Sequence, residues 1–210
     1  MSRRRPVPPA AAALGLLGAG AAITVLVHVP RSRAAVQRLD DRWYALVQRS
    51  RSAPLTAAAK TLDIGFGTTI DWTVRVAVTA RLVRRRRWAA LAAWAATIVL
   101  GEVSVGPLKA FVDRIRPPDP RTTTSMMSYP SGHALAAATT APGIVLALVP
   151  PGPARRRALA VAIPVAGATA VSRTYLNAHW LSDVVGGFAL GTGYALAAPR
   201  VVDRFRRRRT

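Results

Sequence analysis

The chain has 210 residues, 51% of them hydrophobic, and its 30 Lys and Arg against 9 Asp and Glu give a formal net charge of +21. A soluble protein this basic would suggest a nucleic-acid binder, whose basic residues gather on one folded surface beside aromatic side chains. Here the arginines instead form tight clusters between long apolar runs, at positions 3–5, 84–87, 155–157 and 204–209. This distribution argues against a nucleic-acid partner and is typical of a membrane protein.

A helix needs about 20 apolar residues to cross the hydrocarbon core of a bilayer. Five segments come close to this length, at 9–29, 88–108, 133–149, 158–176 and 182–198. We expect the first to be retained as a span, because its apolar run is longer than a cleaved signal peptide needs. Between the first two segments, within 30–54, Leu39, Trp43, Leu46 and Val47 follow the pattern of an amphipathic helix at the membrane surface.

A sixth segment, 55–83, has the required length but carries ionisable residues, among them Lys60, Asp63, Asp71 and Arg75. Asp71 and Arg75 are four residues apart, so one helical face can hold them as a pair. Because ionisable groups at membrane depth usually face the bundle interior, we predict that this segment spans. The alternative is that it lies in the interface. Glu102, in the next span, is expected to pair with Lys60 or Arg75; the alternative is a supporting role near Lys109, which lies on the same face.

Six spans predict an all-α integral-membrane bundle of six transmembrane helices, which forms a single domain over residues 1–210. The loops on the cytoplasmic side of membrane proteins are enriched in Lys and Arg close to the helix ends. With six spans, all four arginine clusters fall on one side of a bacterial-type cell membrane. Both termini are therefore predicted to be cytoplasmic, although the first outer loop, 30–54, also holds six arginines, which are offset by Asp40 and Asp41.

Three polar stretches are then predicted to meet at the outer face: "KAFVDRIRP", "PSGH" and "SRTYLNAHWLSD". Lys109 and Arg116 are seven residues apart, so their side chains point the same way if the helix continues between them. Ser131 is a good N-cap residue, Gly132 lets a ligand approach the backbone, and a helix start attracts anions. Arg173 adds a third cation, whose planar fork suits phosphate oxygens. This combination of groups predicts a pocket for a phosphoryl group.

Two histidines and an aspartate add reactive groups to this pocket. His179 and Asp183 are four residues apart, so on a helix Asp183 can accept the Nδ1–H of His179. That bond leaves Nε2 unprotonated, which is the arrangement of an activated nucleophile. His133 is the second titratable group, placed to protonate a leaving oxygen and then to deprotonate a water. His28 has no such neighbours and is expected to be an interfacial bystander.

The three stretches resemble the signature of the type 2 phosphatidic acid phosphatase (PAP2) superfamily, K-x6-R-P, P-S-G-H and S-R-x5-H-x3-D, between residues 109 and 183. The resemblance implies a metal-independent phosphatase without a cofactor, in which His179 forms a phosphohistidine and His133 is the acid and base. It also implies that five residues hold the phosphate: Lys109, Arg116, Ser131, Gly132 and Arg173. Phosphatase metal centres generally need several carboxylates, and here only Asp183 and Asp113 are near the motifs.

The leading functional prediction is a membrane phosphatase that acts on lipid phosphate or diphosphate monoesters at the extracytoplasmic face. A prenyl diphosphate, phosphatidate and phosphatidylglycerol phosphate would all present a similar phosphoryl end, and the sequence does not select among them. The alternatives are a vanadate-dependent haloperoxidase-like oxidase, whose relatives are soluble, and a non-catalytic lipid- or anion-binding membrane protein. The expected partners are the lipid substrate and the bilayer, and the sequence indicates no particular oligomeric state.

Overall fold

The computed structural model describes residues 10–124 and 127–207, and these form eight helices and no strand. The helices are α1 (Ala10–His28), α2 (Pro30–Arg49), α3 (Ala53–Gly65), α4 (Thr68–Arg84), α5 (Trp88–Val112), α6 (Gly132–Leu148), α7 (Pro153–Tyr175) and α8 (Leu181–Arg207). By length and composition, α1, α5, α7 and α8 can cross a membrane, and α6 is a shorter apolar helix. The predicted all-helical membrane fold is confirmed, whereas the count of six spans is not.

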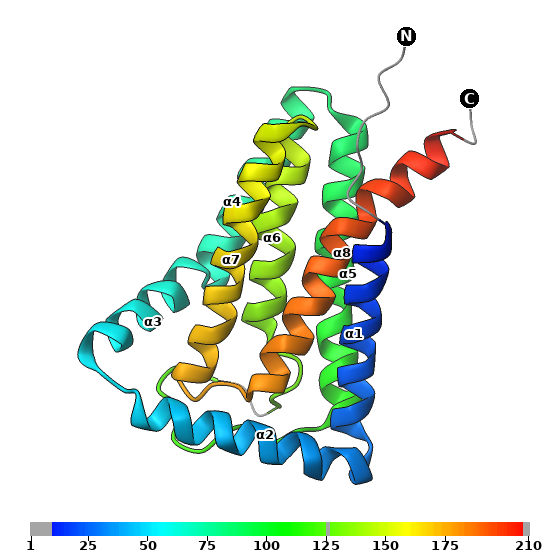
Figure 1. Ribbon diagram of the computed structural model, residues 1–210. Coiled ribbons are helices and arrows are strands. Elements are labelled where there is room, and N and C mark those ends of the chain that lie inside the picture. Colours follow the sequence, from blue (N-terminus) through cyan, green and yellow to red (C-terminus); the bar gives the residue numbers. More distant parts are fainter. Residues whose placement is uncertain (1–9, 125–126, 208–210) are drawn as a thin grey trace.

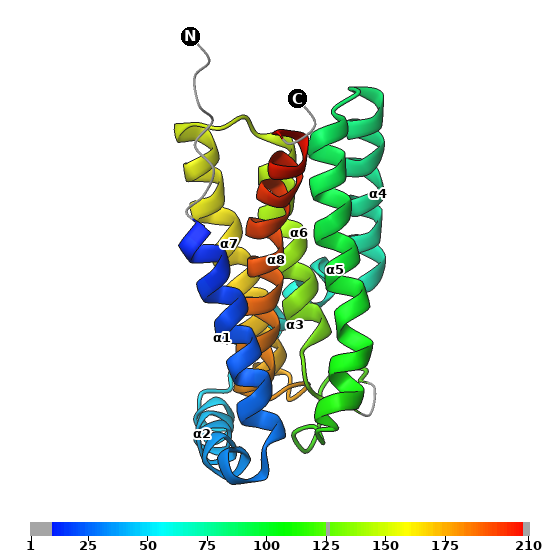
Figure 2. The ribbon, with the colours of Figure 1, turned by 90° about the vertical axis from the view of Figure 1, so that its right-hand side faces the viewer.

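Helix α8 lies at the centre of the bundle and contacts α1, α5, α6 and α7 (Figures 1 and 2). Two glycines of α8 let the backbone of α6 approach closely. A Cβ atom at Gly187 would lie 2.8 Å from the carbonyl oxygen of Ser131, and one at Gly191 would lie 2.5 Å from that of Leu135. Small residues at such positions are how membrane helices pack at short distance. The first turn of α6 is thereby held against α8.

The predicted single span over 55–83 is wrong, because the chain breaks at Phe66 and Gly67 into α3 and α4. Phe66 ends α3, and Gly67 has an extended backbone (φ −66°, ψ 157°) that starts α4 in a new direction. Helix α3 leans outward and packs on the end of α7 through Ala59, whereas α4 runs along the bundle beside α5 (Figure 1).

The ion pairs predicted for this region are present. Arg75 Nε lies 2.7 Å from the carboxylate of Asp71, and Arg75 Nη1 lies 2.5 Å from that of Glu102 on α5. Arg75 and Asp71 are both buried, so the charges face the bundle interior as expected. Pairing of Glu102 with Arg75 is confirmed.

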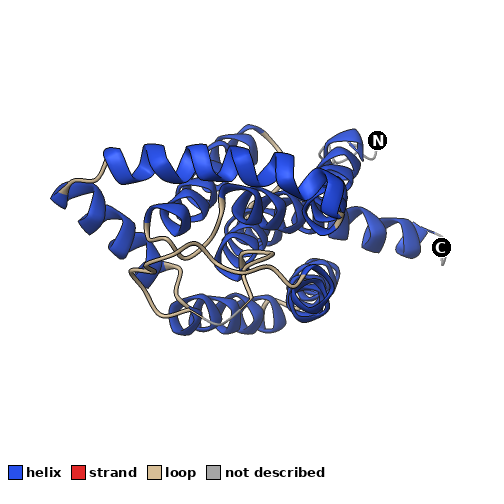
Figure 3. Ribbon diagram, turned by 90° about the horizontal axis from the view of Figure 1, so that it is seen from below, coloured by secondary structure: helices blue, strands red, loops and turns tan. Residues whose placement is uncertain are grey.

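Helix α2 crosses one end of the bundle and covers the loops there (Figure 3). The helix predicted within 30–54 is present as α2. Its buried residues are Asp40 and Val47, whereas Leu39 and Leu46 are 59% and 55% exposed. The inward face of α2 thus carries a carboxylate into the end of the bundle.

Two of the arginine clusters, 84–87 and 155–157, lie where α4 passes into α5 and where α7 begins, at the end of the bundle opposite α2 (Figure 1). Helix α1 begins and α8 ends toward that same end. The cluster at 3–5 and the last residues of the cluster at 204–209 lie outside the described residues. The orientation of this end toward the cytoplasm stays a prediction.

Candidate functional site

The three polar stretches meet at the end of the bundle that α2 covers, where α5 and α7 end and α6 and α8 begin (Figure 1). Two of the predicted cations reach the same backbone carbonyl: Lys109 Nζ donates to the oxygen of Met127 at 2.7 Å and Arg116 Nη2 at 2.9 Å. The predicted reason was wrong, because α5 ends at Val112 and does not continue to Arg116. Asp113 has a left-handed backbone (φ 44°), which turns the chain so that the loop brings Arg116 back to Lys109.

The start of α6 has the geometry that the sequence predicted. Ser131 is the N-cap residue, and its Oγ accepts a hydrogen bond from the backbone N–H of Ala134 at 3.3 Å. A Cβ atom at Gly132 would meet nothing within 4 Å, so the space beside this first residue is open. His133 follows in the same turn, and its Nε2 lies 3.6 Å from a carboxylate oxygen of Asp63.

Arg173 lies in the last turn of α7 and is buried, with 2% of its side chain exposed. Its guanidinium contacts the carboxylate of Asp63, which α3 brings to the site. The carbonyl of Arg173 accepts hydrogen bonds from the backbone N–H of Ala178 at 3.0 Å and of His179 at 3.3 Å. The residue therefore places a cation in the site and also shapes the turn that holds His179.

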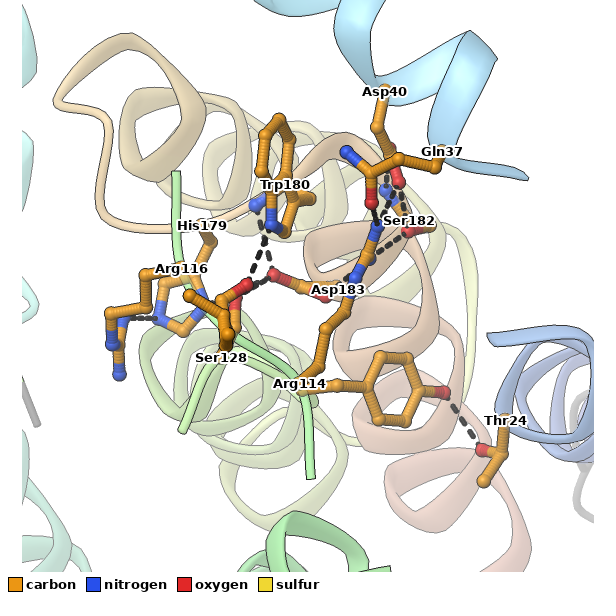
Figure 4. A network of polar contacts seen from close by, with 12 residues as sticks. Thr24, Gln37, Asp40, Arg114, Arg116, Ser128, His179, Trp180, Ser182 and Asp183 are labelled. Carbon is orange, nitrogen blue, oxygen red and sulfur yellow. Dashed lines mark hydrogen bonds and ion pairs between the residues drawn. The ribbon is translucent and has the colours of Figure 1, made fainter. Parts of the chain in front are cut away.

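His179 lies in the turn between α7 and α8, and Asp183 lies in the first turn of α8, so the two are not on one continuous helix as predicted. Their nearest atoms, Nδ1 and Oδ2, are 3.6 Å apart, which is longer than a normal hydrogen bond. Asp183 Oδ2 instead accepts from the backbone N–H of Trp180 at 2.8 Å and from the hydroxyl of Ser128 (Figure 4). The predicted pair is adjacent, but the hydrogen bond between them is not formed.

The other ring nitrogen of His179, Nε2, faces Arg116. Nε2 lies 3.1 Å from Nη1 of Arg116, and because a guanidinium only donates hydrogen bonds, Nε2 must be the accepting, unprotonated nitrogen. The ring proton is then on Nδ1, which faces Asp183. This assignment agrees with the tautomer that the sequence predicted for a nucleophile.

Sequence reasoning missed Arg114, which binds the other oxygen of Asp183. Arg114 Nη1 lies 2.8 Å from Asp183 Oδ1, and Nη2 lies 2.6 Å from Asp40 Oδ2 on α2 (Figure 4). Asp40 also accepts from the backbone N–H of Ser182 at 2.9 Å. Helix α2 is thus tied to Asp183 through a buried row of carboxylate, guanidinium and carboxylate. A signal was present, since Asp40 lies three and seven residues before Trp43 and Val47, on the inward face of α2.

A cavity of about 190 Å³ lies beside His133, between α4, α5 and α6. Its lining combines apolar side chains such as Trp72 with the carboxylates of Asp71 and Glu102. Glu102 therefore pairs with Arg75 and also borders the space next to His133, whereas a supporting role near Lys109 stays a prediction.

Residues 86–207, more than half of the chain, match the sequence model of the PAP2 superfamily. The chain belongs to the PAP2 superfamily. It is 39% identical over 89 residues to phosphatidylglycerophosphatase B of Bacillus subtilis (strain 168). That alignment covers 40% of this chain and 44% of the relative, so the chain matches less than half of the relative's length.

Two solved structures have the fold of this PAP2 protein. The first is the crystal structure of the first transmembrane PAP2 type phosphatidylglycerolphosphate phosphatase from Bacillus subtilis, with a TM-score of 0.75 and 24% identity over 94% of this chain and 97% of that one. The second is Aquifex aeolicus LpxE, with a TM-score of 0.63 and 18% identity over 77% of this chain and 95% of that one. The fold is that of an integral-membrane PAP2 protein.

The part of the chain that matches the PAP2 superfamily begins at residue 86, so Asp40 and Asp63 lie before it. Both carboxylates nevertheless reach the site, Asp40 through Arg114 and Asp63 through Arg173. The N-terminal helices of this PAP2 protein therefore supply charged groups that the three signature stretches do not contain.

The stability of the protein is expected to depend on the protonation of His179. Burial lowers the pKa of its imidazole from 6.5 to about 4, because the charged form would lose its hydration. Between those values the unfolded chain binds more protons than the folded chain, so the free energy of unfolding falls as the pH falls. We expect the thermal midpoint to drop as the pH is lowered from 6.5 to about 4, and a His179→Asn variant to lose part of that slope.

The lowered pKa of His179 can also be measured directly by NMR. In protein labelled at its histidines, the NMR signals of His179 should stay those of a neutral imidazole down to about pH 5. A His179 signal that titrates near pH 6.5 would contradict the expectation.

Proposed function

We propose that this PAP2 protein hydrolyses lipid phosphate or diphosphate monoesters through a phosphohistidine on His179. The observation that carries the proposal is the accepting Nε2 of His179, 3.1 Å from the guanidinium of Arg116. Lys109 donates to the same carbonyl as Arg116, so a second cation lies next to the guanidinium that faces this nitrogen. A nucleophile next to fixed positive charge is what attack on a phosphoryl group requires.

In the proposed first step, Nε2 of His179 attacks phosphorus in line with the ester oxygen. The N–P bond forms, the P–O bond to the lipid breaks, and His133 protonates the departing oxygen. In the second step His133 takes a proton from water, whose oxygen attacks phosphorus and releases inorganic phosphate from His179. The products are the lipid alcohol, or a lipid monophosphate from a diphosphate, and phosphate.

The cations and the helix start supply the electrostatic part of the mechanism. Lys109, Arg116 and Arg173 would neutralise the equatorial oxygens of the transferring group, which is the main contribution in phosphoryl transfer. The open space beside Gly132 would let backbone N–H groups at the start of α6 donate to the phosphate. Asp183, which lies 3.6 Å from Nδ1, would stabilise the positive charge that develops on the His179 ring.

We propose that the reaction needs no metal ion. The two carboxylates nearest the reacting groups are each engaged by an arginine, Asp183 by Arg114 and Asp63 by Arg173. Their charge is therefore already balanced, and the remaining charged groups proposed to face the phosphate, Lys109 and Arg116, are cationic. Cations in fixed positions would stabilise the negative charge on the phosphoryl oxygens, as a divalent ion does in other phosphatases.

We further propose that the site faces the extracytoplasmic side, with both termini in the cytoplasm. The described arginine clusters lie at the opposite end of the bundle, as the positive-inside rule would require. The lipid tail would stay in the bilayer while the headgroup enters the site. The names of the relatives put phosphatidylglycerol phosphate among the candidate substrates, beside phosphatidate and prenyl diphosphates.

The test is phosphate release by the purified protein from these lipids in the presence of EDTA. We expect release from at least one lipid phosphomonoester or diphosphate, at a rate that EDTA leaves unchanged. Phosphate binding without release across the whole panel would instead favour a non-catalytic anion- or lipid-binding protein. Release that stops with EDTA and returns with a divalent metal would exclude the metal-free mechanism.

A further inference from the structure

Asp63 places a negative charge among the groups proposed to bind phosphate. One oxygen of its carboxylate, Oδ1, contacts the guanidinium of Arg173 and lies 3.6 Å from Nε2 of His133. The other oxygen, Oδ2, accepts a hydrogen bond from the hydroxyl of Thr122 at 2.8 Å. Two groups from different helices, α6 and α7, are thus joined by a carboxylate that comes from a third, α3.

The position of Oδ1 is one that a phosphoryl oxygen would take. In the proposed mechanism, Arg173 binds an equatorial oxygen and His133 reaches the leaving oxygen, so the substrate must bring oxygens to the groups that Oδ1 now contacts. Arg173 also has donor capacity left, because its buried Nε has no hydrogen-bond partner among the described residues. A phosphate and the Asp63 carboxylate cannot share this place, since like charges at contact distance repel strongly.

We propose that Asp63 competes with the substrate phosphoryl group for Arg173 and His133, and thereby determines how tightly this site binds phosphate. The proposal rests on the proposed function of the site, and it assigns to Asp63 a role in affinity and no part in the covalent step. The carboxylate turns away when phosphate enters and returns when phosphate leaves.

The surroundings of Asp63 allow this movement. Helix α3 leans out from the bundle and the chain breaks directly after it, at Phe66 and Gly67 (Figure 1). The side chain of Asp63 is 17% exposed, so a change of rotamer can take its charge toward water without moving the helix. Thr122 lies in the loop after Arg116. Its hydroxyl donates a hydrogen bond to Oδ2 of Asp63 and so favours the rotamer that places the carboxylate beside Arg173 and His133.

The experiment is a calorimetric titration of the purified full-length protein with inorganic phosphate. In an Asp63→Asn variant, which keeps the shape and removes the charge, the dissociation constant of phosphate should fall by about tenfold. A Thr122→Ala variant should shift it in the same direction by a smaller factor, because only the hydrogen bond that positions Asp63 is lost. Lys60→Gln, on the exposed face of the same helix, is the matched control and should leave phosphate binding nearly unchanged.

The opposite role for Asp63 makes a different prediction. If the carboxylate instead holds Arg173 in its working position, Asp63→Asn and Thr122→Ala should both weaken phosphate binding. Weaker or unchanged phosphate binding in the two variants would overturn the proposal. If Asp63→Asn does not fold, the phosphate affinity of Thr122→Ala is the deciding measurement. The titration does not depend on turnover. If the protein releases no phosphate from any lipid, that result counts against the proposed function only, and the titration still tests the role of Asp63.

Discussion

Replacing His179 with alanine is expected to reduce phosphate release by about 10⁴-fold or more, because the atom proposed to attack phosphorus is lost. The imidazole is 4% exposed, with Nε2 beside Arg116 and Nδ1 facing Asp183, so no neighbouring side chain is placed to replace it. The measurement is phosphate release from the lipid that the panel identifies as substrate, together with thermal unfolding to show that the variant still folds.

A second observation distinguishes covalent catalysis from simple activation of water. When the protein is mixed with substrate labelled in the transferred phosphate and quenched with alkali, the label should remain on the protein in the wild type and be absent in His179→Ala. His28→Ala is the matched control, since His28 lies at the end of α1 and stacks on Phe111 with ring centroids 4.0 Å apart. Substantial turnover by His179→Ala would remove the phosphohistidine mechanism.

Replacing Arg114 with methionine is expected to lower the free energy of unfolding by about 3–5 kcal/mol, the typical cost of breaking a buried ion pair from one side. Without the guanidinium, the carboxylates of Asp40 and Asp183 remain buried, at 1% and 0% exposure, and keep their charge with fewer partners. We expect a large drop of the thermal midpoint. Phosphate release should also fall, because Asp183 would no longer be held beside His179.

Arg38→Met is the matched control for this prediction. Arg38 is exposed on α2, the helix that carries Asp40, and its replacement should change the free energy of unfolding by no more than about 0.5 kcal/mol. If Arg114 and Asp40 form an ion pair of this strength, adding Asp40→Asn to Arg114→Met should restore part of the lost stability. The double variant removes one of the two carboxylate charges that Arg114→Met leaves buried. Equal stability of Arg114→Met and the wild type would show that this buried row contributes nothing.

The sequence by itself determined the apolar helices and most residues of the site. The runs that became α1, α5, α6, α7 and α8 are visible because hydrophobicity over about 20 residues is a local property. Ser131 as an N-cap and the pairing of Asp71 with Arg75 are likewise local, since both depend on neighbours within four residues. The meeting of the three polar stretches at one end of the bundle also follows from the sequence, because each apolar helix between them carries the chain from one end of the bundle to the other.

Only the tertiary structure decided how the charged groups are paired. Arg114 contacts Asp40, 74 residues earlier in the chain, and no periodicity of either segment specifies that meeting. Asp63 was assigned to a membrane span, but the break at Phe66 and Gly67 turns α3 outward and brings its carboxylate to Arg173. A buried charge needs a partner, but which partner it finds depends on how helices distant in sequence pack.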